Sequence, residues 1–217
     1  MKKRKDKLII FLFHALLFTA IHSVQAQTRG YDKEILDWRE KYKTNLLKDT
    51  GWLTLTGLFW LKEGVNTVGK AGISDVELTE SFSGERFGEI ELKDGVAFLR
   101  TGSGVKALID GTSVSEGEIF RDGNNGATKT VHIGSQSFFV IKREERYGVR
   151  LRDTKSPARS KFTGLNWYSV DTRYRIKASF EAFPNPDVIT VPNILGGTFE
   201  YKSPGLLKFE LDGNTNT

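Results

Sequence analysis

The sequence contains no cysteine, which excludes disulfide bonds, thiol nucleophiles and thiolate ligands for a metal. Histidine is almost as scarce: His14 and His22 lie in the first 26 residues, and only His132 lies in the rest of the chain. One histidine with carboxylates rarely holds zinc. Calcium held by loop carboxylates stays open, although Asp122-Gly123-Asn124-Asn125 lacks the ligand spacing of a known calcium loop. We expect no metal site and no cofactor. Because His132 stands between Val131 and Ile133, we expect it to face solvent from a strand rather than to act as a catalytic base.

A basic excess is also missing from most of the chain. The formal net charge is +5, from 32 basic and 27 acidic residues. Residues 1–26 carry five of the basic and one of the acidic residues, so 27 basic and 26 acidic residues remain. A nucleic-acid-binding domain needs a basic surface, and the near balance of charge therefore predicts that nucleic acid is not a partner.

The first 26 residues have the three parts of a secretory signal peptide. Five basic residues stand in positions 1–7, an apolar run follows over 8–21, and Ser23-Val24-Gln25-Ala26 offers a small-residue cleavage site. The run is shorter than the roughly 20 apolar residues of a spanning helix. No cysteine follows it to carry a lipid anchor. We therefore predict cleavage after Ala26, export to the periplasm or the medium, and no membrane span in the mature chain.

The remaining chain has one helical pattern followed by many short strand patterns. Ile35, Trp38, Tyr42 and Leu46 fall at helical spacing and predict an amphipathic helix over 31–48. From residue 52 onward, β-forming runs alternate with turn residues, as in the run 87–99, which turns at Asp94-Gly95. This texture predicts a mainly β fold: an antiparallel β-sandwich, a second small β module and one N-terminal helix.

The expected organisation is a signal peptide over 1–26, the helix region over 27–50, the β-sandwich over 51–143 and the second β module over 144–217. Within the last module, Ser156 and Pro157 predict the start of a short helix over 157–163. Alternating residues predict a strand over 174–180, and Pro184-Asn185-Pro186 predicts a loop.

The last residues read as half of a hairpin. Leu207, Phe209 and Leu211 alternate with polar residues, and Asp212-Gly213 predicts a tight turn. Only residues 214–217 follow it, so we expect the returning strand to be absent. On this interpretation the chain is cut inside its second β module.

Several longer stretches resemble bacterial domain-of-unknown-function family 1684. The matching stretches are 51–61 (GWLTLTGLFWL) with Gly64 and Gly69, 146–153 (RYGVRLRD), 156–159 (SPAR), 162–168 (FTGLNWY), 191–193 (VPN) and 203–205 (SPG). The resemblance covers about residues 33–213 and implies no particular reaction. It also implies that complete members continue beyond the final turn, through a strand, a Gly-Arg hairpin and a tail rich in Asn, Pro, Cys and Phe.

A second resemblance, over residues 58–141, is to the forkhead-associated sandwich, on Val68-Gly69-Lys70, 75–78 (DVEL) and Asp110-Gly111-Thr112. It implies a sandwich fold. The phosphothreonine-binding residues of that family do not match, because Lys70 stands where arginine is expected and no His or Asn stands in the matching loops. Fold alone carries no function.

The arginines are the main candidates for a binding site. If Val149 and Leu151 face the core, Arg150 and Arg152 share the opposite face of their strand. Several neighbouring guanidinium groups can grip a carboxylate, phosphate or sulfate. The candidate ligand-binding residues are Arg150, Arg152, Arg159, Arg175, Tyr147 and Asn193. The alternative is that these arginines form ion pairs on the surface with Asp153, Asp171 and Glu181.

Two interpretations are also open for three of the tryptophans, Trp52, Trp60 and Trp167. They could form a platform that stacks on sugar rings, but large aromatic side chains belong more often to a core, and we expect a core position.

Three functional hypotheses follow. The first is a non-catalytic exported protein that binds a small anionic or glycan ligand near Arg150, Arg152 and Arg159. The second is a cofactor-free hydrolase whose acid and base are carboxylates. The third, which rests on the half hairpin, is a truncated copy without function.

Overall fold

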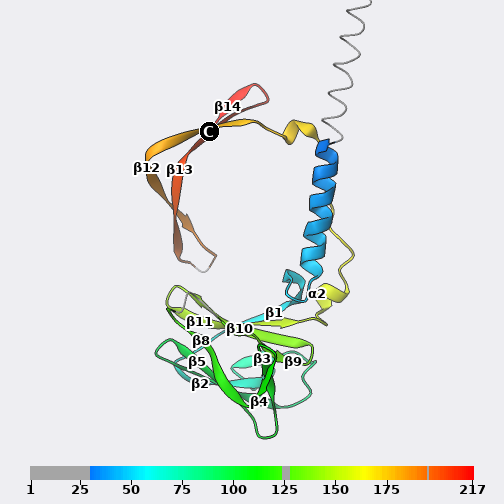
Figure 1. Cartoon of the computed structure of the whole chain (residues 1–217), viewed down its shortest axis with the longest axis vertical. Helices are drawn as coiled ribbons and strands as arrows, with labels where there is room; N and C mark the ends of the chain where they lie inside the picture. Colours follow the sequence, from blue (N-terminus) through cyan, green and yellow to red (C-terminus); the bar gives the residue numbers. More distant parts are fainter. Residues whose placement is uncertain (1–29, 124–127, 195) are drawn as a thin grey trace, which may run out of the picture. The chain divides into compact units, whose positions relative to one another are not determined.

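A computed structural model describes residues 30–123, 128–194 and 196–217 (Figure 1). The predicted signal peptide lies outside the described residues. The chain divides into two compact units, which we call the sandwich unit (Trp38–Asn166) and the ribbon unit (Met1–Asp37 with Trp167–Thr217). A helix over residues 30–47 contributes to both and matches the predicted helix within one residue at each end.

Two sheets form the sandwich unit. Sheet A has the strand order β1-β11-β10-β9-β6-β7, and sheet B has the order β3-β2-β4-β5-β8. Sheet A comprises β1 (Leu55–Trp60), β6 (Ala107–Ile109), β7 (Thr112–Val114), β9 (Val131–Ile133), β10 (Gln136–Arg143) and β11 (Arg146–Asp153). Sheet B comprises β2 (Gly64–Lys70), β3 (Val76–Leu78), β4 (Arg86–Lys93), β5 (Val96–Thr101) and β8 (Glu116–Arg121). β2 and β3 are parallel, whereas β10 and β11 form a long antiparallel pair. The predicted mainly β, sandwich-like fold is confirmed.

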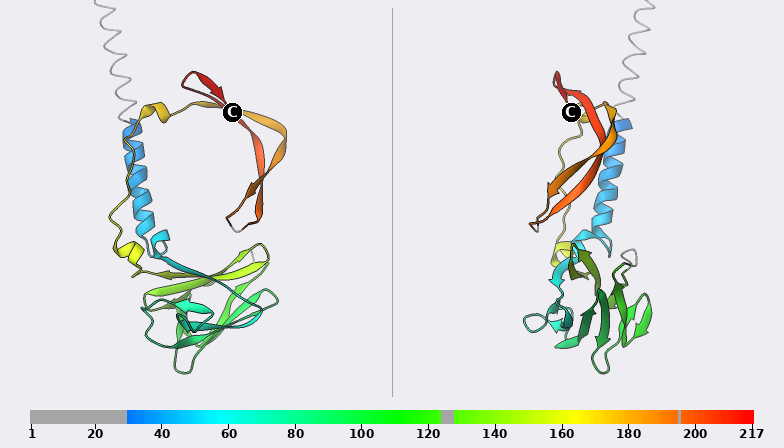
Figure 2. Two further views of the ribbon diagram at one scale, coloured as in Figure 1. Left: turned by 180° about the vertical axis from the view of Figure 1, so that it is seen from behind. Right: turned by 90° about the vertical axis from the view of Figure 1, so that its left-hand side faces the viewer.

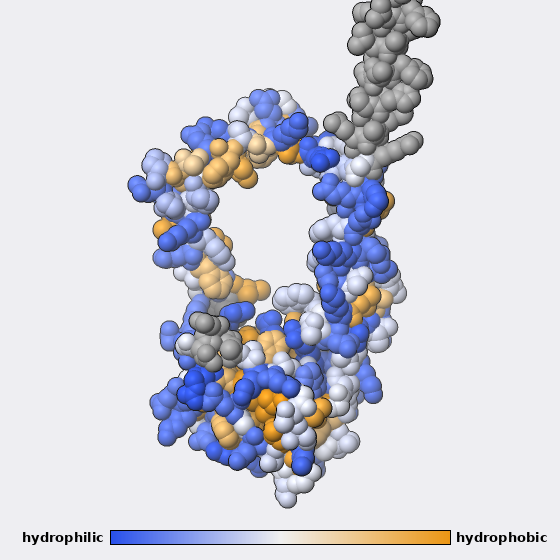
Figure 3. Space-filling view, viewed as in Figure 1, coloured by the Kyte–Doolittle hydropathy of each residue, from blue (hydrophilic) through white to orange (hydrophobic). Residues whose placement is uncertain are grey.

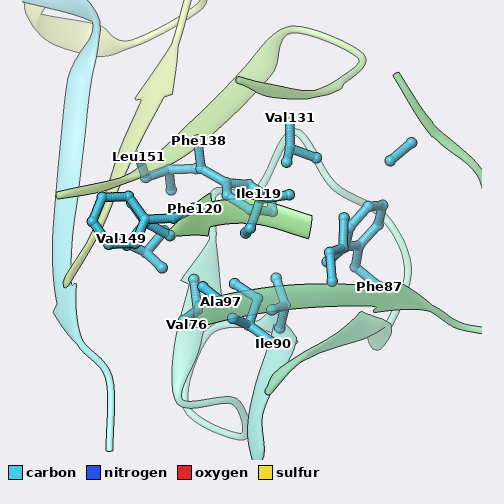
Figure 4. Packing of buried hydrophobic residues seen from close by; sticks show 14 of the residues in the cluster. Val76, Phe87, Ile90, Ala97, Ile119, Phe120, Val131, Phe138, Val149 and Leu151 are labelled. Carbon is cyan, nitrogen blue, oxygen red and sulfur yellow. The ribbon is translucent and has the colours of Figure 1, made fainter. Parts of the chain in front are cut away.

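One apolar core fills the space between the two sheets (Figure 4). Every second residue of β11 contributes to it, so that Val149 and Leu151 are fully buried. Phe138 of β10 meets Phe87 of β4 edge to face, with ring centroids 6.3 Å apart. These contacts explain why the alternating runs form strands, because only period two puts all the apolar side chains of a strand on one face.

Asp-Gly pairs make the tight turns that the sequence predicts. Asp94 and Gly95 join β4 to β5 with φ angles of 48° and 73°. Asp110 and Gly111 join β6 to β7 in the same way, with φ angles of 48° and 82°. Two successive positive φ angles match the right-handed twist of the flanking strands.

The division of the chain differs from the expected one. β11 pairs with β10 over its whole length and also with β1, so it is an inner strand of sheet A. The expected boundary after residue 143 therefore falls in the β10–β11 hairpin, and the sandwich unit extends to Asn166. The short helix α2 (Pro157–Ser160) lies in this unit too; Ser156 caps it, and it ends three residues earlier than expected.

The ribbon unit contains a short 3-10 helix, η2 (Thr172–Tyr174), and a sheet of β12 (Ala178–Pro192), β13 (Thr198–Leu211) and β14 (Asn214–Asn216). Three expectations are corrected here. Residues 174–177 are not strand. The segment 184–186 is not a loop but part of β12, where the pairing shifts between Ala182 and Asp187. Proline lacks a donor for the ladder yet keeps an extended backbone, which explains this irregularity.

The third correction concerns the end of the chain. Residues 214–216 form β14 and pair with β13, so that a short returning strand follows the turn at Asp212-Gly213. The φ angles of 52° and 78° at that turn are the ones an Asp-Gly hairpin requires.

β12 and β13 form a long twisted ribbon (Figures 1 and 2). Its pairing register gives it two chemically different faces. The register places apolar side chains opposite each other, as in Phe180 with Leu207 and Ile189 with Tyr201. The residues between them on the strands are mainly polar, as in the pair Ser179 and Lys208. No described residue of the ribbon unit is buried, and Figure 3 shows hydrophobic side chains on the surface of the ribbon.

Candidate functional site

β11 separates the arginines from the core. Its buried residues include Val149 and Leu151, whereas Arg150 and Arg152 are only partly buried and point to the outer face of sheet A. The sequence predicted this arrangement from the alternation along the strand. Arg146 shares the same face, because it lies four residues from Arg150.

Each of these three guanidinium groups stacks on an aromatic ring. Arg146 lies 3.9 Å from the ring centroid of Trp60, Arg150 lies 5.7 Å from that of Trp52, and Arg152 lies 4.7 Å from that of Phe139. Stacking fixes the plane of a guanidinium group but leaves its N–H donors free for other partners. We call this surface the arginine face. It comprises Arg146, Arg150, Arg152, Trp52, Trp60 and Phe139.

The positive charge of the arginine face is not neutralised by neighbouring carboxylates. None of its three arginines forms an ion pair in the described part of the chain. Burial lowers the pKa of Arg152, and the neighbouring charge of Arg150 lowers it further. The Nε atom of Arg152 is buried and has no hydrogen-bond partner among the described residues. An anion on this face would meet the partly buried guanidinium group of Arg152, whose Nε donor lacks a partner, beside that of Arg150.

The expected ion-pair partners are engaged elsewhere. Asp153 points to the other side of β11 and accepts hydrogen bonds from Thr79 and Ser81, at 2.6 and 2.8 Å. Asp171 pairs with Arg173 at 2.6 Å, and Glu181 pairs with Lys208. The alternative of a surface paired with these three carboxylates therefore holds for Asp171, which pairs with Arg173, and fails for Arg150 and Arg152 in the described part of the chain.

Arg159 is committed to the fold and does not join the arginine face. Its Nε donates to the carbonyl oxygen of Leu47 at 3.0 Å, and its Nη1 donates to that of Thr154 at 2.9 Å. Its Nη2 lies 2.8 Å from a carboxylate oxygen of Asp49. These contacts hold α2 against the end of the N-terminal helix within the sandwich unit.

Tyr147 lies on the core side of β11, opposite to the arginine face. Its ring meets Phe120 edge to face, and its hydroxyl donates to Asp122 at 2.8 Å. That hydrogen bond is the main reason why the pKa of Tyr147 is raised. Lys142 also donates to Asp122, at 2.7 Å, and this bond, followed by that of Tyr147, lowers the pKa of the Asp122 carboxyl.

The other two candidates lie in the ribbon unit. Arg175 stacks over the ring of Tyr31 at 5.3 Å and lies 3.9 Å from the carboxylate of Glu34. Asn193 helps to close the turn between β12 and β13, where its side chain accepts from the amide of Gly197 at 3.1 Å. Of the four predicted ligand-binding residues in the sandwich unit, the structure thus brings only Arg150 and Arg152 together.

Sequence reasoning missed Arg146, Trp60 and Phe139 as parts of this surface, and it assigned Trp52 to a core. Trp52 is instead 70% exposed. The signal for Arg146 was present in the same alternation that singled out Arg150. The aromatic partners carried no comparable signal, because Trp60 comes from β1 and Phe139 from β10.

His132 is exposed on β9, opposite Ser137 of β10, as expected for a strand residue facing solvent. Among the described residues, no group of three His, Cys, Asp or Glu side chains could hold a metal ion. Nor does any helix of the described part have the length and hydrophobicity needed to cross a membrane.

Asp153 lines a cavity of about 650 Å³ together with Thr79 and Ser81, among others. Burial alone would raise the pKa of Asp153, but hydrogen bonds, led by that from Thr79, hold it below its usual value. A general acid needs a raised pKa. Every described carboxyl group with a clear shift is shifted downward, and these are Asp75, Glu118, Asp122, Asp153 and Asp171.

Two comparisons with known proteins bear on identity. No curated protein matches this sequence. The likeness to the forkhead-associated sandwich stays a prediction. A family model described as "Protein of unknown function (DUF1684)" matches residues 160–217, which include η2 and the whole β12–β14 sheet. This match supports the resemblance to that family over residues 160–217, the last part of the stretch for which the sequence predicted it.

Proposed function

We propose that this protein is exported and binds an anionic ligand, without catalysis, between Arg150 and Arg152 on the arginine face. The observation that carries the proposal is the state of these two guanidinium groups: they are neighbours on one face, each stacks on an aromatic ring, and neither has a carboxylate partner in the described part of the chain. Burying a cation that has no partner of opposite charge costs free energy, and a bound anion offsets this cost.

Binding is tested by calorimetric titration of the exported chain with galacturonate at constant ionic strength. We expect saturable binding that Arg150→Ala and Arg152→Ala each weaken at least tenfold. Arg100→Ala is the matched control, because Arg100 also stacks on an aromatic ring, that of Phe98 at 5.0 Å, but pairs with Glu91 at 2.8 Å. Binding that survives in both variants, or no binding at all, would overturn the proposal.

Export is supported by the order of charge, apolar residues and small residues in positions 1–26. Mass spectrometry of the protein recovered from the periplasm or the medium should give a chain that begins at Gln27. A chain recovered only from the cytoplasm, with Met1 still attached, would contradict export and leave the binding proposal to its own test.

A further inference from the structure

The three arginines of β11 form a row rather than a single pocket. A strand rises about 3.3 Å per residue, so Arg150 and Arg152 stand roughly 7 Å apart along β11, and Arg146 stands roughly 20 Å from Arg152. One small anion can be shared by Arg150 and Arg152, but it cannot also reach Arg146. Arg146 is nevertheless held in the same way as the others, since it stacks on Trp60 at 3.9 Å.

Apolar side chains cover the surface between Arg146 and Arg150. We call the side chains of Trp60 and Leu58 at this place the apolar floor. Gly148 occupies the intervening position on this face, and a Cβ atom there would meet the ring of Trp60 at 3.0 Å and the side chain of Leu58 at 3.2 Å. Trp60 and Leu58 therefore fold over the glycine and fill the space between the two cations. Trp52, next to Arg150, remains 70% exposed.

Cations separated by an apolar floor fit one class of polyanion better than the others. A sugar ring carries a carboxylate at its edge and an apolar C–H face that packs against aromatic rings. Polyphosphate has no such face. Nucleic acid has stacking bases, but its binding rests on a broad basic surface, and the chain outside residues 1–26 is close to neutral.

Resting on the proposed function, we propose that the ligand is an acidic oligosaccharide that lies along β11. Its carboxylates would lie at Arg152, Arg150 and Arg146, and a sugar ring would lie over the side chains of Trp60 and Leu58 that cover Gly148. Each further contact adds to affinity without a new loss of overall freedom, so binding strength should grow with the length of the chain.

The test is a titration of the exported chain with galacturonate of increasing length, from the monomer to the hexamer, at constant ionic strength. We expect affinity to rise at least tenfold from monomer to hexamer. Arg146→Ala should bring the ratio of hexamer to monomer affinity toward one, whereas Arg100→Ala should keep the full ratio. A neutral hexamer of glucose should bind at least tenfold more weakly than the acidic hexamer.

The outcomes separate the two proposals. If monomer and hexamer bind equally and Arg150→Ala weakens both, the extended ligand is wrong and the anion site stands. If no acidic sugar binds but polyphosphate does, and Arg150→Ala weakens that binding, the glycan is wrong and the anion site stands; if neither binds, both proposals fail. Polyphosphate or a single-stranded DNA oligomer that binds as tightly as the hexamer would overturn the choice of a glycan. A Trp60→Ala variant that keeps full affinity for the hexamer would show that the apolar floor does not contribute to binding.

Discussion

The guanidinium group of Arg159 donates its Nε proton to the carbonyl oxygen of Leu47 across 3.0 Å, although 112 positions separate the two residues in the sequence. Its second hydrogen bond, to Thr154, closes the turn before α2. The ion pair with Asp49 adds little, because Asp49 is 74% exposed. Arg159 therefore links the segments around Leu47 and Thr154 by donating to the backbone carbonyl of each. A lysine ammonium group lacks the planar fork of donors that makes both hydrogen bonds possible.

Arg159→Ala should lower the free energy of unfolding of the exported chain by about 2 kcal/mol, as expected for hydrogen bonds from a charged donor. Arg159→Lys should recover less than half of this, since an ammonium group lacks the fork that reaches both carbonyls. Urea unfolding measures both values, with the exposed Lys161→Ala as control. Binding of galacturonate should persist in Arg159→Ala; its loss would return Arg159 to the ligand site.

The contrast between Arg150 and Arg159 shows what the sequence could predict. The position of Arg150 follows from alternation along a single strand, a local property that a sequence displays directly. The partners of Arg159 are set by the packing of segments far apart in the chain, and no local pattern encodes them. For the same reason the aromatic partners on β1 and β10 could not be assigned to β11 from the sequence.

The irregular elements were missed for a related reason. Pro184 and Pro186 are strong loop signals, yet they lie within β12, because a shift in pairing accommodates residues without a backbone donor. Tyr174 alternates with its neighbours but lies in η2, which Asp171 caps through the amide of Arg173. Propensity is a weak prior where capping and pairing compete with it.

Close packing of backbone against backbone makes Gly88 of β4 intolerant of a side chain. A Cβ atom there would lie 2.2 Å from the carbonyl oxygen of Arg100 and 2.8 Å from the Cα atom of Thr101. Gly88→Ala should therefore cost about 3 kcal/mol, since the neighbouring strand must move. The measurement is chemical unfolding of the variant.

Gly117→Ala is the matched control for Gly88→Ala in the same sheet. Its Cβ atom would meet only the side chain of Ile109, at an ordinary 3.5 Å, so the change should stay within about 1 kcal/mol. Equal losses in the two variants would refute the account based on backbone contact.

The Asp75 carboxyl group should make the free energy of unfolding of the sandwich unit depend on pH in the acid range. Hydrogen bonds lower its pKa from 3.8 to about 2, first that from Lys62, then those from the amide and hydroxyl of Thr67. A lowered pKa stabilises the fold above the unfolded value, and this stabilisation is lost as the pH falls from about 4 to about 2. The shift corresponds to about 2.5 kcal/mol at full strength, which solvent screening of this partly exposed group reduces to about 1 kcal/mol.

The measurement is the difference in free energy of unfolding between the parent chain and Asp75→Asn, followed from pH 6 to pH 2. The difference should shrink toward zero at the acid end. Asp110→Asn, at an exposed turn position with positive φ that asparagine tolerates, should show no such trend. A difference that stays constant over this range would show that the carboxylate charge of Asp75 does not stabilise the sandwich unit.

The ribbon unit should open far more easily than the sandwich unit. Its strands β12 and β13 pair on both sides of the shift between Ala182 and Asp187, but no described residue of β12, β13 or β14 is buried. β10 and β11, by contrast, carry fully buried residues such as Phe138 and Val149. A ribbon without a core is marginal in water. In hydrogen exchange followed by mass spectrometry, the amides of β12 and β13 should exchange roughly 100-fold faster than those of β10 and β11, because local opening exposes no core. Equal protection in the two units would mean that the apolar face of Phe180, Leu207 and their neighbours is covered in solution.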